Sequence, residues 1–292
     1  MRKRIALIIV AALAALSIVS MAACGGESES GTGAQSPEPS ATETDFATIL
    51  GHAPTGVAKQ IEDEGTITIA TDANYPPQSF VDDSGEQVGF DQDVVRLVAE
   101  KLGVELDVVH PNFDSWPTGL KVGRLQVATS MGPTPERRET LDFSVPYYYE
   151  AGVVVTRVGE PTINSDEEMS GKTIGATVAS TATAYLDEVD GVEVKTYAVD
   201  NDAFPDLLNG RLDGVMTYAA VATEAIASGK AMQMSETTYF TGPQCLAVNK
   251  GETDLVALLD HVLNGLREDG TLSELSLQWY RGVDVTVEVP EE

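Results

Sequence analysis

Apolar residues along the chain follow two patterns, short β-branched runs and longer segments with helical spacing. Residues 66–71 (TITIAT) are of the first kind, and a glycine and a proline-containing loop flank them. Residues 91–103 (DQDVVRLVAEKLG) are of the second kind, because their valines and leucines share one broad face and the segment stops at a glycine. Strands that alternate with helices predict mostly parallel sheets with helices on both faces, and therefore an α/β fold.

The same alternation continues through the chain. Further strands are expected at 104–109, in the run ending at 129, and at 152–158, 173–176, 192–197, 212–217 and 245–249; further helices are expected at 115–122, from 134 onward, and at 181–188, 201–209, 219–228, 254–268 and 272–279. The strand 152–158 (GVVVTRV) has no helix before the next polar loop. It therefore separates two series of strand–helix units.

The tripeptide Gly-Arg-Leu occurs twice, at 123–125 and 210–212, between a predicted helix and a predicted strand. Each glycine closes a helix, and each following strand is expected to be a buried member of a separate parallel sheet. Open α/β sheets bind ligands outside the carboxyl ends of their strands, where Thr129–Ser130 and Thr217–Tyr218 stand. Two facing half-sites predict a clamp; chance recurrence of a tripeptide is the alternative.

The first residues have the pattern of an export signal. Residues 1–4 carry three positive charges, residues 5–19 are almost wholly apolar, and small residues precede Cys24. The apolar run is short for a membrane span. Because Cys24 directly follows the small residues, the segment resembles the lipobox of bacterial lipoproteins. We therefore expect a signal peptide at 1–23 and lipid on Cys24; an ordinary cleaved signal with an incidental cysteine is the alternative.

The composition predicts a flexible tether and a negatively charged surface that disfavours anionic partners. Residues 24–45 are rich in small and polar residues and are expected to form a flexible tether behind the lipidated cysteine. The formal net charge of −28 repels nucleic acid and anionic lipid headgroups. The second cysteine, Cys245, lies in an apolar run and is expected to be a buried hydrophobe, not a disulfide partner.

Six motifs, in order, resemble those of bacterial extracellular solute-binding proteins of family 3, which deliver polar amino acids to ABC importers. They are TDANYPPQSF, VGFDQDVVRLVAEKLG, FDSWPTGLKVGRL, TSMGPTPERRETLDFSVPYYYEAG, LNGRLDGVMTYAAVA and LREDGTLSELSLQWYRG, and the resemblance extends from Ile67 to Gly282. It implies a two-lobed periplasmic-binding-protein-like fold with crossover strands near 152–157 and 244–249. Lobe 1 would comprise 62–151 plus 245–282, lobe 2 would comprise 152–244, and 283–292 would be an acidic tail.

The resemblance also implies which residues bind the carboxylate of an amino acid. Arg137 matches the arginine that binds it, and a planar guanidinium suits bidentate pairing. Ser180 and Thr181 match a helix start whose free N–H groups favour an anion. The alternatives are an exposed helix arginine, which is the expectation for Arg138, and a Ser180 that only caps its helix.

The rest of the implied site surrounds the side chain and ammonium of the ligand. Asp72 and Tyr75 match a cleft-facing acid and a stacking aromatic, and Phe113 matches a second aromatic wall. Thr129 and Ser130 match small polar residues that hold the ammonium. Alternatively, Tyr75 anchors its loop and Phe113 belongs to the core.

Two positions depart from the family pattern. Gly132 stands where a Ser or Thr usually helps to bind the carboxylate, although its backbone N–H still donates. Tyr218 stands where an aspartate commonly pairs with the ammonium, and a tyrosine is neutral at pH 7. Three explanations are open: Asp72 and neutral oxygens hold the ammonium; the ligand nitrogen is methylated, cyclised or absent; or the ligand lies differently. We favour the second.

These patterns predict a lipid-anchored extracytoplasmic receptor that acts as a monomer, binds a polar amino acid or derivative, and delivers it to an ABC permease through hinge closure. No motif indicates a cofactor or a catalytic site, and the cleft residues lack the grouped ligands of a metal site. The alternatives are a sensory ligand-binding module for a receptor or kinase and a dehydratase-like enzyme on the same fold.

Overall fold

The computed structural model describes residues 45–288 of the chain. The predicted signal peptide, Cys24 and the tether up to residue 44 lie outside the described residues, as do residues 289–292. Within residues 45–288, no helix is long and apolar enough to cross a membrane.

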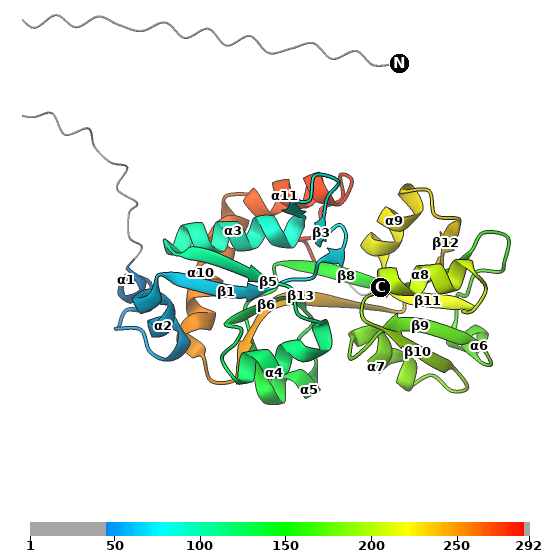
Figure 1. Cartoon of the computed structure of the whole chain (residues 1–292), viewed down its shortest axis with the longest axis horizontal. Helices are drawn as coiled ribbons and strands as arrows, with labels where there is room; N and C mark the ends of the chain where they lie inside the picture. Colours follow the sequence, from blue (N-terminus) through cyan, green and yellow to red (C-terminus); the bar gives the residue numbers. More distant parts are fainter. Residues whose placement is uncertain (1–44, 289–292) are drawn as a thin grey trace, which may run out of the picture. The chain divides into compact units, whose positions relative to one another are not determined.

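The described chain folds into two α/β lobes joined by two long strands, β8 and β13 (Figure 1). The linking strands are β8 (Tyr148–Arg157) and β13 (Phe240–Asn249). The elements of lobe 1 are α1 (Phe46–Leu50), α2 (Gly56–Glu64), β1 (Thr66–Ala70), β2 (Asn74–Tyr75), β3 (Ser79–Val81), β4 (Gln87–Val88), α3 (Phe90–Leu102), β5 (Glu105–Val109), η1 (Phe113–Ser115), α4 (Trp116–Lys121), β6 (Val127–Met131), α5 (Pro135–Thr140), β7 (Leu141–Phe143), α10 (Thr253–Glu268) and α11 (Thr271–Trp279). The elements of lobe 2 are α6 (Asp166–Met169), β9 (Thr173–Thr177), α7 (Thr181–Asp187), β10 (Glu193–Tyr197), α8 (Asp200–Leu208), β11 (Gly214–Tyr218), α9 (Ala219–Ala227) and β12 (Met232–Met234).

The strands of both lobes form one ten-stranded sheet, in the order β10-β9-β11-β8-β13-β6-β1-β5, with β12 and β7 beside β8 and β13. Pairing is parallel inside each lobe, between β1, β5 and β6 and between β9, β10 and β11, as predicted. The prediction of two separate sheets is wrong. Tyr148–Gly152 of β8 pairs with Phe240–Gln244 of β13, and the second half of each linking strand continues into a lobe.

Helices cover both faces of the sheet in each lobe, because side chains alternate between the faces of a strand. In β8, Val153 and Val155 pack beneath α8 and α9, whereas Val154 packs on the opposite face beneath α6 and α7. In lobe 1, α3, α10 and α11 cover one face, and α4 covers the other around the buried Trp116 (Figure 1). The loops that follow the parallel strands are left facing the gap between the lobes.

Two segments outside the predicted lobe boundaries pack against lobe 1. Helices α1 and α2 insert Phe46 and Ile61 into its core, although the sequence pattern predicted no element there. Beyond residue 282, the backbone N–H of Tyr149 donates to the carbonyl of Val285 at 2.8 Å, and Thr286 is buried. Part of the predicted acidic tail therefore lies along the linking strand β8.

Candidate functional site

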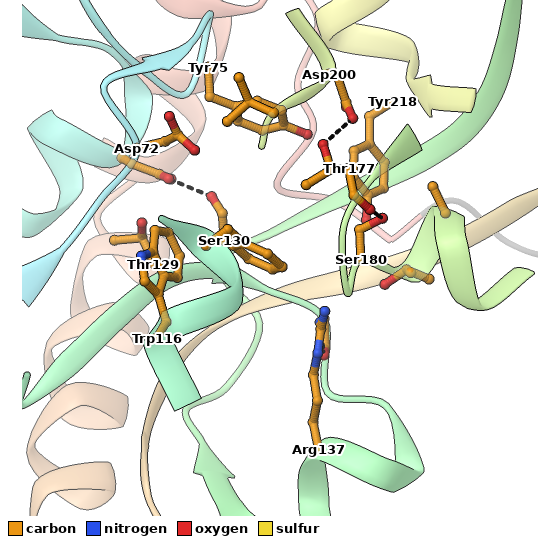
Figure 2. Close-up of a pocket in the computed structure, with 16 residues that line it drawn as sticks. Asp72, Tyr75, Trp116, Thr129, Ser130, Arg137, Thr177, Ser180, Asp200 and Tyr218 are labelled. Carbon is orange, nitrogen blue, oxygen red and sulfur yellow. Dashed lines mark hydrogen bonds between the residues drawn. The ribbon is translucent and has the colours of Figure 1, made fainter. Parts of the chain in front are cut away.

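One cavity between the lobes collects every residue predicted to bind a ligand (Figure 2). The predicted residues in its lining are Asp72, Tyr75, Phe113, Thr129, Ser130, Gly132, Arg137, Ser180, Thr181 and Tyr218. The lining residues that sequence reasoning missed are Asp91, Trp116, Thr177, Ala182, Val199 and Asp200. The roles of these residues toward a ligand stay predictions, but their common location is established.

The cavity lies at the carboxyl ends of the parallel strands, where α/β sheets bind ligands. In lobe 1, Asp72 follows β1, and Ser130 is the next-to-last residue of β6. In lobe 2, Thr177 ends β9 and Tyr218 ends β11. The two Gly-Arg-Leu units therefore lead to opposite walls of one cavity, as the clamp interpretation predicted.

Arg137 extends from α5 into the cavity and crosses to lobe 2. Its Nη1 donates to the carbonyl of Gly132 at 2.9 Å, its Nη2 donates to the carbonyl of Ala179 at 2.7 Å, and its guanidinium lies 5.4 Å from the centroid of the Phe113 ring. Burial lowers the pKa of Arg137, but an arginine side chain keeps its charge in proteins. Within residues 45–288 no carboxylate forms an ion pair with it, so its positive charge stays available to an anion.

The start of α7 forms the wall opposite Arg137. Ser180 caps this helix, since the backbone N–H of Thr183 donates to its Oγ at 3.2 Å, which confirms the capping interpretation while Ser180 also lines the cavity. A Cβ placed on Gly132 would lie 3.3 Å from Oγ1 of Thr181. The absent side chain at Gly132 therefore allows the two lobes to approach closely.

The two Gly-Arg-Leu strands end in the same arrangement, a hydroxyl that donates to an aspartate at a helix start. In lobe 1, Ser130 donates to Asp91 of α3, and the hydroxyl of Tyr147 donates to the same carboxylate at 2.6 Å. In lobe 2, Thr217 at the end of β11 donates to Asp200 of α8 at 2.7 Å, as does Thr177 at 2.5 Å. Asp91 and Asp200 thus present carboxylates to the cavity from opposite lobes.

Three carboxylates and one guanidinium line the cavity. Burial raises the pKa of Asp72, Asp91 and Asp200, for Asp91 to about 6, and the charge of Asp72 raises the pKa of the other two further. Figure 2 shows Asp72 and Asp200 on one side of the cavity and Arg137 on the other. This separation of charges matches a molecule that carries both an anionic and a cationic group.

Aromatic rings close the remaining sides of the cavity. Burial raises the pKa of Tyr218 to about 12, so its hydroxyl is neutral at pH 7, and its ring meets Phe240 edge-on at 5.8 Å. Phe113 packs against Trp116 with ring centroids 4.9 Å apart and packs on the core of lobe 1, and it also lines the cavity; its role as an aromatic wall for a ligand stays a prediction.

The lobes touch each other across the cavity. Tyr75 of lobe 1 packs against the apolar core of lobe 2, and Nδ2 of Asn201 donates to the carbonyl of Asn74 at 3.0 Å. Together with the bond from Arg137 to Ala179, these contacts hold the cleft in a closed arrangement.

A fourth carboxylate lies on the linking strand β8. Glu150 is buried and accepts a hydrogen bond from Nε2 of Gln78, while Oε1 of Gln78 has no partner within residues 45–288. Burial raises the pKa of Glu150 well above its usual value, and the charges of Asp91 and Asp200 raise it further.

Comparison with known proteins agrees with this architecture. The family model of bacterial extracellular solute-binding proteins, family 3, matches residues 67–282. The chain belongs to this family. As a family 3 solute-binding protein, it has the lobes and the interlobe cavity that the resemblance implied, and its curated relatives are binding proteins.

Curated relatives and a solved structure extend the comparison. A probable amino-acid ABC transporter-binding protein of Haemophilus influenzae is 30% identical over 238 residues, covering 79% of this chain and 90% of its own. The L-cystine-binding protein TcyJ of Escherichia coli is 27% identical, covering 82% and 91%. An ancestral arginine-binding protein solved with arginine bound has a TM-score of 0.71 and 32% identity, covering 74% and 98%.

Proposed function

We propose that this family 3 solute-binding protein is a lipid-anchored extracytoplasmic receptor for a polar amino acid or amino-acid derivative, which it delivers to an ABC importer. This proposal rests on one observation: positively and negatively charged side chains lie on different sides of the interlobe cavity. Arg137 offers a guanidinium that pairs with no carboxylate of residues 45–288, and Asp72 lies on the opposite side of the cavity. An amino acid carries matching charges, and a bidentate guanidinium–carboxylate pair is both strong and geometrically selective.

Closure of the cleft would connect binding to delivery. The residues that line the cavity come from both lobes, so a bound molecule adds contacts that exist only when the lobes are together. A ligand shifts a conformational equilibrium by its difference in affinity for the two states. The closed, loaded form is therefore the form that a permease would recognise, and β8 and β13 are the hinge strands.

The lipid anchor is proposed from the export signal and Cys24. Residues 45–288 form the compact receptor, and the chain before them is long enough to connect it to a membrane. Metabolic labelling with a radioactive fatty acid tests the anchor. Label in the wild-type protein and none in Cys24→Ser supports it, whereas equal labelling contradicts it.

A thermal-melt panel on the soluble form, residues 25–292, tests the proposed function. The panel contains the twenty amino acids, followed by opines, ectoines and betaines. A compound at one hundred times its dissociation constant stabilises the protein by about 2.7 kcal/mol. A clear rise in melting temperature with one compound class supports the proposal, and its absence throughout the panel contradicts it.

Tyr218→Asp tests whether Tyr218 selects the form of the ligand nitrogen. The new carboxylate would pair with a primary ammonium, whereas the native ring favours a methylated or cyclised nitrogen through its face. We expect compounds with a free ammonium to gain about tenfold in affinity relative to betaines and ectoines, from a charge-assisted bond of about 1.5 kcal/mol. If the order of affinities in the panel does not change, Tyr218 does not set this preference.

A further inference from the structure

In the described part of the chain, the wall that lobe 2 presents to the cavity contains a single charged side chain. The lining residues of this wall are Thr177, Ser180, Thr181, Ala182, Val199, Asp200 and Tyr218. Hydroxyls and apolar groups make up the rest, and the high pKa of Tyr218, about 12, keeps it neutral. Among the described residues of lobe 2, Asp200 is therefore the one that can offer a full negative charge to a ligand.

Asp200 is held firmly but keeps hydrogen-bonding capacity. Thr177 donates to one carboxylate oxygen at 2.5 Å, and Thr217 donates to the other at 2.7 Å. Each carboxylate oxygen accepts more than one hydrogen bond, so acceptor positions remain. The side chain is 3% exposed, and no lysine, arginine or histidine within residues 45–288 forms an ion pair with it. A buried carboxylate without a cationic partner is costly.

Asp72 faces Asp200 from lobe 1. Burial raises the pKa of Asp200 first, and the charge of Asp72 raises it further, although the hydrogen bonds from Thr177 and Thr217 lower it. The two carboxylates therefore repel each other when the lobes come together. A positively charged group between them replaces this repulsion with two attractions.

We propose that Asp200 is a ligand-binding residue that pairs with a positively charged group of the bound amino acid and, together with Asp72 on the other lobe, makes closure of the cleft depend on that charge. This inference rests on the proposed function. It supplies the countercharge that Tyr218 lacks, so a ligand with an ordinary ammonium group fits the cavity. The competing interpretation is structural: Asp200 begins α8 and connects β9 to β11 through the two threonines.

Calorimetric titration of the twenty L-amino acids into residues 25–292 tests the proposal, with wild type, Asp200→Asn and Asp202→Asn compared. Asn is nearly isosteric with Asp and keeps an oxygen for the threonines. For the amino acid that wild type binds most tightly, we expect Asp200→Asn to weaken affinity by at least about thirtyfold, the effect of removing one partner of a buried charge pair. Asp202 lies two residues further along α8 and is exposed, so Asp202→Asn should remain within about threefold, as expected for a solvated charge.

A carboxylate placed elsewhere on the lobe 2 wall of the cavity should restore the affinity that Asp200→Asn loses. Tyr218→Asp should raise affinity by a factor at least about threefold larger in the Asp200→Asn background than in the wild-type background, because only there does its carboxylate replace a missing countercharge on the same wall of the cavity. If the role of Asp200 is purely structural, Tyr218→Asp should give the same gain in both backgrounds. Failure of this rescue contradicts the proposed role of Asp200 in binding.

A second measurement does not depend on the variant folding. The carboxyl carbon of Asp200, followed by ¹³C NMR in the wild-type protein, should titrate at lower pH when the amino acid is bound, because a nearby cation favours the ionised form. An unchanged titration overturns the inference, as does wild-type affinity in Asp200→Asn. If no amino acid binds but a derivative from the melt panel does, that derivative replaces the amino acid in the titration; if no compound of the panel binds the wild-type protein, the proposed receptor function fails first, and the role of Asp200 fails with it.

Discussion

Replacing Arg137 by lysine is expected to weaken amino-acid binding by about a thousandfold while the ligand-free protein stays folded. Lysine keeps the positive charge but cannot reproduce the planar fork of a guanidinium, so the bidentate pair with the carboxylate is lost; each hydrogen bond to a charged group contributes about 1.5–3 kcal/mol. In the structure Arg137 also donates to the carbonyls of Gly132 and Ala179, which a lysine can reach only in part. Calorimetric titration with the best amino acid of the melt panel measures the loss.

Arg138→Lys is the matched control for this prediction. Arg138 is adjacent in α5, but it lies exposed, donates to the carbonyl of Pro133 at 3.0 Å and does not line the cavity. Its substitution should change affinity by less than about threefold, since exposed charges contribute little. Similar losses in both variants would mean that the loss does not come from the guanidinium fork of Arg137.

Replacing Glu150 by glutamine is expected to stabilise the soluble form at pH 7 by about 3 kcal/mol, the scale of a buried carboxyl group together with an unpaired buried amide oxygen. Glutamine removes a buried acid whose pKa is raised by burial and by the charges of Asp91 and Asp200. Its amide N–H₂ can also donate to Oε1 of Gln78, which has no partner within residues 45–288. A chain of this size should then melt roughly 9 °C higher.

The pH dependence of the Glu150→Gln effect has a defined sign. Below about pH 4.3, the ordinary pKa of a glutamate, Glu150 is protonated in both the folded and the unfolded chain, and only the new hydrogen bond should separate the variants. Above that pH the unfolded chain loses the proton while the folded chain retains it, so the wild type loses stability relative to the variant. Chemical denaturation at several pH values checks this, with the exposed Glu160→Gln as control. A stability difference that does not grow with pH would contradict the buried-acid explanation.

Sequence pattern predicted most of the strand–helix units, because their apolar faces are long and regular. The pattern failed for helices α1 and α2, which are short, although Val57 and Ile61 of α2 follow a helical spacing. It also placed the start of one linking strand at residue 152, whereas β8 begins at Tyr148. The first half of each linking strand is extended because β8 and β13 pair with each other there. Pairing between segments so far apart in the sequence cannot be recognised from the local pattern of residues.

The residues around the cavity came from family resemblance, whereas Asp91 and Asp200 did not. Both stand at the start of a helix, where aspartate is common for reasons unrelated to a ligand. In the structure, each Gly-Arg-Leu unit leads to a strand-end hydroxyl that donates to one of these two aspartates. Only the folded chain brings these pairs together.

The pairing of β8 with β13 gives the cleft an elastic element. Because the two strands bond to each other over Tyr148–Gly152 and Phe240–Gln244, the lobes cannot rotate about isolated single bonds; their movement must twist a two-stranded ribbon, a form of sheet that accepts more twist than wider ones. Gly152 has no room for a Cβ because the Phe240 ring lies against it. The packing at this junction therefore determines the resting angle between the lobes, and with it the mechanical work that a bound ligand must perform to keep them closed.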